Sequence, residues 1–226
     1  MKQLSVAIDG PAGAGKSTVA RQVAKQLGLI YVDTGAMYRA ITWKALTHGV
    51  DLTHEETVTQ MAQRTDIRLS TDIKGSDVWV DGTTVTEEIR SPEVTAHVST
   101  IAGQSKVREV LVDKQREMGR KGGVVMDGRD IGTHVLPDAE VKVFLTASIE
   151  ERARRRYQEM IRRGYEVDLE ELKEEIGLRD EKDKNREHSP LRPAEDAIHL
   201  DTTGLSIDDV ISRILHLCRT NLGGEE

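Results

Sequence analysis

A glycine-rich segment near the N-terminus carries the clearest chemical signal in this sequence. Residues 10–17 read GPAGAGKS and fit the pattern G-x-x-x-x-G-K-[S/T] at every fixed position. An apolar run precedes the segment and a helical pattern follows it, which is the strand-loop-helix setting that the motif requires. Glycines allow backbone N–H groups and the start of the next helix to wrap closely around a triphosphate. The segment therefore predicts a loop that binds the phosphates of ATP.

Each polar side chain of this loop has an expected partner. Lys16 supplies a mobile positive charge for the β- and γ-phosphates, the Ser17 hydroxyl binds Mg²⁺, and Thr18 lies near the α-phosphate. Mg²⁺, bound together with ATP, is the expected cofactor. The predicted ATP site comprises Gly10, Pro11, Ala12, Gly13, Ala14, Gly15, Lys16, Ser17 and Thr18. The loop alone leaves open whether the γ-phosphoryl group goes to water, to a protein switch or to a second substrate.

Two arginines stand where a second anion could bind. Arg39 lies one turn into a helix that Asp33 or Thr34 can cap. Arg129 follows an apolar run, Val124 to Met126, and so lies just past the carboxyl end of a predicted strand. Open α/β sheets bind their ligands at that edge, which favours a functional role for Arg129.

A third group of arginines occupies residues 152–163, with six arginines against the single acid Glu159. Residues 165–184 then carry nine acids against four bases. We expect two oppositely charged helices that pair across a hinge at Gly164 and close over phosphates as a lid, the alternative being a static helical hairpin. Glu151 and Arg155 form an i,i+4 pair, whereas Arg154 and Arg156 lack an obvious local partner.

The arginines favour phosphoryl transfer between two anions over hydrolysis. Transition-state charge spreads over the transferring oxygens, so positive charge matters more than a base. A hydrolase would need a glutamine or glutamate that orients water, and none stands out beside the loop.

The elements that must position these residues follow from hydrophobic patterning. Short apolar runs alternate with amphipathic stretches, which predicts an α/β fold with a mostly parallel sheet. A small antiparallel insert, with turns at residues 74–77 and 81–82, interrupts the alternation. Strands are expected at residues 4–8, 124–126, 141–145 and 197–200, and helices at residues 16–27, 36–48, 106–118, 149–163, 169–185 and 206–222.

Composition excludes several classes of protein. The 32 basic and 39 acidic side chains give a net charge of −7, and the seven aromatic rings are too few for a series of base-stacking platforms, which argues against a nucleic-acid polymer as partner. Cys218 is the single cysteine, so an internal disulfide is impossible. No apolar run reaches the roughly 18 residues that a membrane span needs. We expect a cytoplasmic monomer that contacts no membrane.

Together these segments resemble the bacterial cytidylate kinases over essentially the whole chain. The resemblance rests on GPAGAGKST at residues 10–18, DTGAMYR at 33–39, the insert after residue 65, VREVLVDKQR at 107–116, DGRDIGT at 127–133, ERARRR at 151–156 and RDEKDKNR at 179–186. It implies an α/β P-loop nucleoside monophosphate kinase fold, with a central parallel sheet flanked by helices, a small antiparallel β insert and a helical lid. The implied regions are a core at residues 1–35, 111–150 and 189–226, a monophosphate-binding region at 36–110 with the insert at about 65–90, and a lid at 151–188.

The resemblance also implies an activity, the transfer of the ATP γ-phosphoryl group to CMP or dCMP, and a role for individual residues. The implied catalytic residues are Lys16, Arg129 and Arg155, the last being similar to lid arginines that reach the transferring phosphate. The implied CMP contacts are Thr34, Arg39 and Arg129 for the phosphate, Ser99, Arg108, Asp130 and Arg186 for cytosine, and Arg179 and Asp183 for the sugar. The family often has serine where this chain has Thr34, and the hydroxyl is retained.

Two other hypotheses about the function remain open at this point. The first is a kinase for another small acceptor, such as shikimate or a different nucleoside monophosphate. The second is a nucleotide-dependent switch whose insert binds a partner. The switch lacks an Asn-Lys-x-Asp element for guanine, because Asn185 is followed by Arg186 and Glu187, and it leaves the arginines without an anion.

Overall fold

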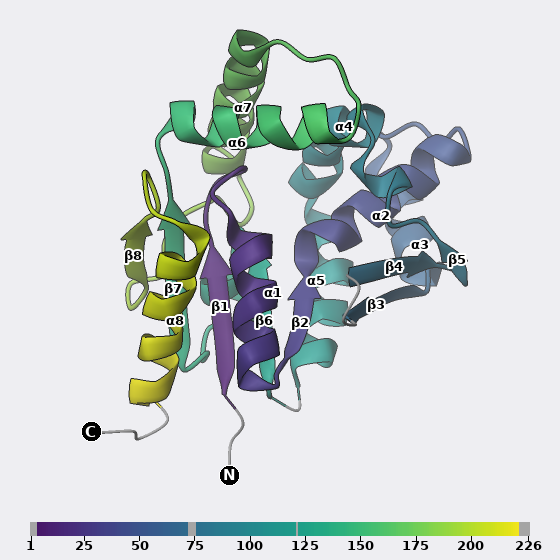
Figure 1. Ribbon diagram of the computed structural model, residues 1–226. Coiled ribbons are helices and arrows are strands. Elements are labelled where there is room, and N and C mark those ends of the chain that lie inside the picture. The colour runs from purple at the N-terminus through teal and green to yellow at the C-terminus, as the bar shows by residue number, and fades with distance from the viewer. Residues whose placement is uncertain (1–3, 72–75, 121, 222–226) are drawn as a thin grey trace.

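The central element of the fold is a parallel sheet. The computed structural model describes residues 4–71, 76–120 and 122–221. In these ranges five strands join in the order β2-β6-β1-β7-β8, with every neighbouring pair parallel (Figure 1). They are β1 (Ser5–Asp9), β2 (Ile30–Asp33), β6 (Val124–Gly128), β7 (Val141–Thr146) and β8 (Ile198–Asp201). The predicted α/β class is confirmed.

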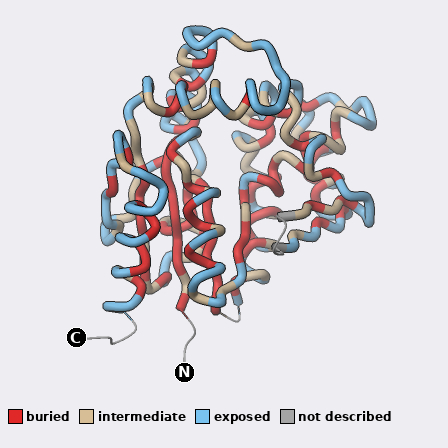
Figure 2. The backbone as a smooth tube through the Cα atoms, viewed as in Figure 1, coloured by how far each residue is buried: buried red, intermediate tan, exposed pale blue. Residues whose placement is uncertain are grey.

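Helices cover both faces of this sheet, which explains why its inner strands are mostly apolar, with Asp9 and Asp127 at or near the carboxyl ends of β1 and β6. Helices α1 (Lys16–Leu27) and α8 (Ile207–Asn221) pack on one face against β1 residues Val6 and Ile8. Helix α5 (Ser105–Gly119) and the single π-helical turn η2 (Ile131–Val135) cover the other face. Figure 2 shows the inner strands as buried along their length.

The insert is antiparallel, as expected. Strands β3 (Ile67–Thr71), β4 (Ser76–Val80) and β5 (Thr83–Thr84) pair in order, and Asp81 and Gly82 form the tight turn with φ of 50° and 83°. The other expected turn, at residues 74–77, includes residues 74 and 75, which lie outside the described residues. Helices α2 (Thr34–Thr47), α3 (Glu55–Arg64) and α4 (Pro92–Gly103) and the short 3₁₀ helix η1 (Glu88–Arg90) complete this part of the molecule around a second apolar core.

Two helices lie across the carboxyl ends of the sheet strands (Figure 1). Helices α6 (Ile149–Arg162) and α7 (Leu169–Lys184) pack against each other, and Gly164 between them adopts a left-handed φ of 81°. Ion pairs join the two helices at Arg152–Asp180, 2.6 Å, and Lys173–Glu150, 3.3 Å. The expected pairing of the two helices is confirmed.

Six elements of the described chain were not among those expected from the sequence: the short elements β5, η1 and η2, and also β2, α3 and α4. Strand β2 is a four-residue edge strand whose Ile30 is exposed, so its apolar signal is weak. Helix α3 has buried residues at positions 58, 59 and 62. Helix α4 begins with Ser91, whose hydroxyl accepts from Val94 N at 3.3 Å, followed by Pro92 at its first position. A serine cap followed by proline is a helix-start signal that can be recognised in the sequence.

Candidate active site

The predicted phosphate loop connects β1 to α1 in the geometry that phosphate binding requires. Gly13 and Gly15 adopt left-handed φ angles of 76° and 89°, and Gly10 has a φ of 147°. A Cβ at Gly10 would lie 2.0 Å from the carbonyl oxygen of Leu145, so only glycine fits there. Gly15 precedes the first turn of α1 without a side-chain cap among the described residues. The first N–H groups of α1 are thus available for an anion.

Two polar side chains of the loop, buried Lys16 and half-buried Ser17, are held by hydrogen bonds. Lys16 Nζ donates to the carbonyl oxygen of Pro11 at 2.8 Å, and burial, followed by the charge of Arg129, lowers the pKa of this lysine. Ser17 Oγ donates to Asp127 Oδ2 at 2.9 Å, while Asp127 Oδ1 accepts from Tyr31 OH at 2.8 Å. Burial raises the pKa of Asp127. Thr18 is exposed.

A cluster of guanidinium groups lies beside Lys16. Arg39, half-buried in α2, donates to Ile89 O at 3.2 Å and to Thr95 Oγ1 at 2.8 Å. Burial lowers the pKa of Arg39, and the charges of Arg179 and Arg156 lower it further. Arg179 is likewise lowered by burial and then by Arg129. Burial is the main cause of these lowered pKa values and the neighbouring arginines add to it, so a bound anion would favour the charged form of both side chains.

The charges of this cluster are only partly balanced. Arg129 Nε donates to Asp183 Oδ2 at 2.8 Å. Burial opposes ionisation of Asp183, but the neighbouring charges of Arg129, Arg179 and Arg186 outweigh it and lower the pKa of this carboxyl. Helix α2, the strand end of β6 and helix α7 therefore bring Arg39, Arg129 and Arg179 to one place from positions far apart in the sequence.

A second polar group lies where α4, α5 and α7 meet. Arg108 is buried in α5, pairs with Asp130 and donates to the carbonyl oxygen of Ala102 at 3.0 Å. Arg186 donates to the same carbonyl at 3.3 Å. Ser99, half-buried, precedes Ala102 by one turn of α4. The predicted cytosine contacts are thus close together, although Ser99 makes no hydrogen bond that the structure records.

Several buried donors of this group lack a partner. Among the described residues, Arg108 Nε, Arg179 Nε and Arg186 NH2 have no hydrogen-bond partner. A buried donor without an acceptor is costly, roughly 1–3 kcal/mol each. These unpaired donors belong to residues of the predicted CMP site, and a ligand rich in acceptors could pair with them.

Asp33 and Thr34 make side-chain hydrogen bonds at the start of α2. Asp33 caps the helix by accepting from Ala36 N at 2.9 Å, and Thr34 is the first helical residue. The Thr34 hydroxyl donates to the carbonyl oxygen of Asp127 at 2.7 Å and is buried. Its donor is therefore committed to the sheet edge, and the oxygen can only accept from a further group.

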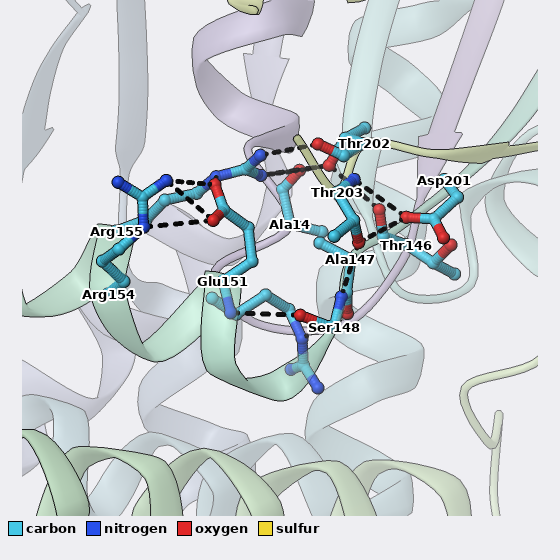
Figure 3. A network of polar contacts seen from close by, with 11 residues as sticks. Ala14, Thr146, Ala147, Ser148, Glu151, Arg154, Arg155, Asp201, Thr202 and Thr203 are labelled. Atoms are coloured by element: carbon cyan, nitrogen blue, oxygen red, sulfur yellow. Dashed lines mark hydrogen bonds and ion pairs between the residues drawn. The ribbon is translucent and has the colours of Figure 1, made fainter. Parts of the chain in front are cut away.

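The arginines of α6 are more fully paired than the sequence indicated. Arg155 Nε donates to Glu151 at 2.8 Å, and its terminal nitrogens donate to Thr202 Oγ1 at 3.0 Å, to Thr202 O at 2.8 Å and to Ala14 O at 3.5 Å (Figure 3).

The prediction that Arg154 and Arg156 lack local partners was wrong. Arg154 pairs with Glu151 at 2.7 Å and Arg156 with Glu159 at 3.0 Å, both at i,i+3 spacing.

Sequence reasoning assigned no role to three buried residues of the site. Asp127 holds Ser17, Arg152 donates to Ala12 O of the loop at 3.0 Å, and Asp9 accepts from the backbone after Asp130. Asp9 and Asp127 each stand at or near the carboxyl end of a predicted strand, which was a usable signal. Arg152 is one of six arginines in its segment, and nothing in the spacing distinguishes it.

The fold and the site define a class. A parallel sheet whose first strand ends in a phosphate loop, with arginines gathered opposite that loop, is a P-loop phosphotransferase of small molecules. No helix in the described ranges is long and apolar enough to cross a bilayer.

Comparisons with known proteins give the family. The family described as Cytidylate kinase matches residues 6–220. The chain is 59% identical to a cytidylate kinase of Bacillus subtilis over 95% of this chain and 96% of that protein, and 56% identical to one of Pediococcus pentosaceus over 94% of each. The chain belongs to the cytidylate kinase family. A crystal structure of an uncharacterized protein from Eubacterium ventriosum, 12% identical, covers 97% of this chain and 99% of that chain with a TM-score of 0.52, a likeness of fold alone.

Proposed function

We propose that this protein transfers the γ-phosphoryl group of ATP to CMP or dCMP, giving ADP and CDP or dCDP. The observation that carries the proposal is the convergence of Arg39, Arg129 and Arg179 beside Lys16, with orphaned buried donors next to them. The family membership supports the same activity.

On the donor side, the loop at residues 10–18 holds the ATP phosphates. Lys16 meets the β- and γ-phosphates, whose negative charge reverses the unfavourable burial of its ammonium group. The hydroxyl of Ser17 and the carboxylate of Asp127 are hard oxygen donors that fit Mg²⁺. Mg²⁺, bound with ATP, would neutralise charge on the phosphates.

On the acceptor side, Arg39 and Arg129 hold the CMP phosphate, with Thr34 nearby. An oxygen of that phosphate forms a bond to the γ-phosphorus while the bond from the γ-phosphorus to the β,γ-bridging oxygen breaks, and ADP leaves with the electron pair. The attacking phosphate is already an anion, so no base is needed. The positive groups stabilise the charge that spreads over the transferring oxygens.

Recognition of cytosine follows from the group around Asp130. Cytosine presents an amino donor at N4 and acceptors at O2 and N3, so the Asp130 carboxylate with Arg108 and Arg186 complements it, with Ser99 alongside. Uracil would present O4 to the carboxylate and be repelled. Asp183 and Arg179 then face the ribose or deoxyribose hydroxyls.

The remaining assignments concern motion and assembly. We assign residues 36–110 to monophosphate binding, residues 151–188 to a lid and the rest to the core, with the protein acting as a monomer. Arg155 is assigned to the transferring phosphate, and its bonds to Thr202 and Ala14 would be exchanged for phosphate contacts as ATP binds. Two cysteines that crosslink the lid open should abolish transfer, and unchanged transfer would contradict a moving lid.

A rate assay tests the activity directly. ADP release from Mg·ATP is measured with CMP, dCMP, UMP, AMP and GMP as acceptors, at equal concentration. We expect CMP and dCMP to accelerate ADP release well above the rate without acceptor, and the purines to have little effect. If no monophosphate accelerates ADP release, the kinase assignment fails.

A further inference from the structure

Asp9 is a buried carboxylate at the end of β1, immediately before the phosphate loop, and the proposed transfer step assigns it nothing. Only 4% of its surface is exposed. Its Oδ1 accepts from Ile131 N at 2.9 Å and its Oδ2 from Gly132 N at 2.8 Å. Each oxygen of the carboxylate therefore accepts a hydrogen bond from one of two successive backbone N–H groups in another segment.

That other segment carries the acceptor-site residues. Ile131 and Gly132 begin the π-helical turn η2, directly after Arg129 and Asp130. The strand pairing places Asp9 opposite Gly128. From this position the Asp9 side chain extends past the end of β6 and accepts hydrogen bonds from the backbone that follows Asp130. The two hydrogen bonds therefore hold the backbone that directly follows Arg129 and Asp130.

The buried position of the Asp9 carboxylate is unfavourable for its charged form. Burial raises the pKa of Asp9 to about 6, while the hydrogen bonds from Gly132 and Ile131 lower it. The charges that face it are Asp130, which raises its pKa, and Lys16, which lowers it. No described lysine or arginine forms an ion pair with Asp9. An apolar residue would satisfy the core but would leave the two N–H groups unpaired.

We propose that Asp9 is a positioning residue that aligns the acceptor site with the donor loop, by clamping the backbone after Asp130 to the strand that leads into Gly10. The inference rests on the proposed function, because alignment matters only if a phosphoryl group passes between the two sites. A displacement of about 1 Å at the reacting centre lowers rates by roughly a hundredfold.

The test compares Asp9→Asn with the wild-type protein and with Asp209→Asn. Asparagine keeps the shape of aspartate, but its amide group places an N–H donor against one of the two backbone N–H groups. Asp209 is the control, because its Oδ2 also accepts two hydrogen bonds, from Ser206 N at 3.3 Å and Ser206 Oγ at 2.6 Å, at the start of α8. The measurements are kcat, the KM values for CMP and ATP, and the rate ratio of CMP to UMP.

We expect Asp9→Asn to lower kcat and raise the KM for CMP at least tenfold, with a smaller CMP to UMP ratio and a KM for ATP within threefold of wild type. Asp209→Asn should stay within twofold in all four quantities. A loss shared equally by CMP and ATP, or no loss, would overturn the positioning role. A wild-type protein inactive on CMP would instead refute the proposed function.

A second measurement does not depend on the variant folding. Amide hydrogen exchange of Ile131 and Gly132 in the ligand-free wild-type protein should be slow, at least a hundredfold below the rate of an open chain. Exchange at the open-chain rate would show that the clamp does not hold and would overturn the proposal.

Discussion

The donor and acceptor sides of the active site are built in different ways. The donor side is nine consecutive residues between one strand and one helix, and its lysine donates to the loop's own Pro11 carbonyl. The acceptor side takes its arginines from α2, α5, α7 and the end of β6, and it leaves buried donors unpaired. The first is built from one local segment, whereas the second depends on side chains that converge from four elements. The binding energy of CMP should therefore depend on the acceptor cluster and hardly on the loop.

The largest effect is expected on the donor side, from Lys16→Met. Removing this charge should lower kcat by roughly 10⁴-fold, because it stabilises the transferring phosphoryl group. The affinity for CMP, measured by calorimetry, should stay within threefold of wild type. Lys25→Met, at the exposed end of the same helix, is the control and should leave kcat unchanged. A large loss of CMP affinity in Lys16→Met would contradict the separation of the two sides.

Asp130→Ala tests the acceptor side. We expect the preference for CMP over UMP, taken as the ratio of kcat/KM values, to fall by roughly 10²–10³-fold, since the carboxylate that distinguishes N4 from O4 is lost. ATP binding should persist. Asp138→Ala, an exposed substitution, serves as the control. An unchanged ratio in Asp130→Ala would remove Asp130 from base recognition.

Two buried acids near the active site, Asp9 and Asp183, should also differ in how they respond to pH. Burial raises the pKa of Asp9 to about 6. The folded state therefore holds this proton more tightly than the unfolded state, and the stabilisation is lost as pH rises from about 4 to 6, by up to about 3 kcal/mol. Urea unfolding at several pH values should show Asp9→Asn gaining stability relative to wild type over that window.

Asp183 should behave in the opposite sense. Burial disfavours its charge, but Arg129 and Arg179 outweigh burial and lower its pKa. Its stabilising contribution is present above about pH 4 and is lost as pH falls through the lowered pKa. Asp183→Asn should thus lose stability relative to wild type as pH rises from acid. Parallel pH profiles for the two variants would contradict the electrostatic contrast.

The smallest effect is expected from Thr202→Val. The variant loses the hydroxyl that accepts from Arg155 at 3.0 Å, while the bond to the Thr202 carbonyl persists. We expect a loss of about 1 kcal/mol in unfolding free energy and a change in kcat of a few-fold. Thr203→Val removes the acceptor for Ser148 N instead, and should change stability without changing kcat. Equal kcat values for the two variants would show that Thr202 does not act through Arg155.

The same contrast explains what the sequence could predict. The loop at residues 10–18 and helix α1 follow from local spacing, because glycines, Lys16 and the helix start are adjacent in the chain. The parallel sheet and the α6–α7 pair likewise follow from patterning and charge. The prediction that Arg154 and Arg156 lack local partners was wrong, because it did not consider i,i+3 spacing. At that spacing Arg154 pairs with Glu151, and Arg156 pairs with Glu159.

The contacts of Asp9 and Arg108 could not be predicted from local sequence. Asp9 binds backbone groups 122 and 123 residues away, and Arg108 pairs with Asp130 across 22 residues. Such partners depend on how strands and helices stack, which periodicity does not specify. The family resemblance supplied roles for Arg108 and Asp130 because it transfers residue by residue. It supplied none for Asp9, whose role emerges from the hydrogen bonds alone.

The most direct test of the acceptor cluster is the affinity that the phosphate of CMP adds. Calorimetric titrations of CMP and of cytidine into wild-type protein and Arg39→Gln measure this difference. The account predicts that wild type binds CMP at least roughly 100-fold more tightly than cytidine, and that Arg39→Gln narrows the ratio at least tenfold, because charge-assisted bonds to the phosphate are lost. Equal affinities for CMP and cytidine in wild type would contradict the assignment of the guanidinium cluster to the acceptor phosphate.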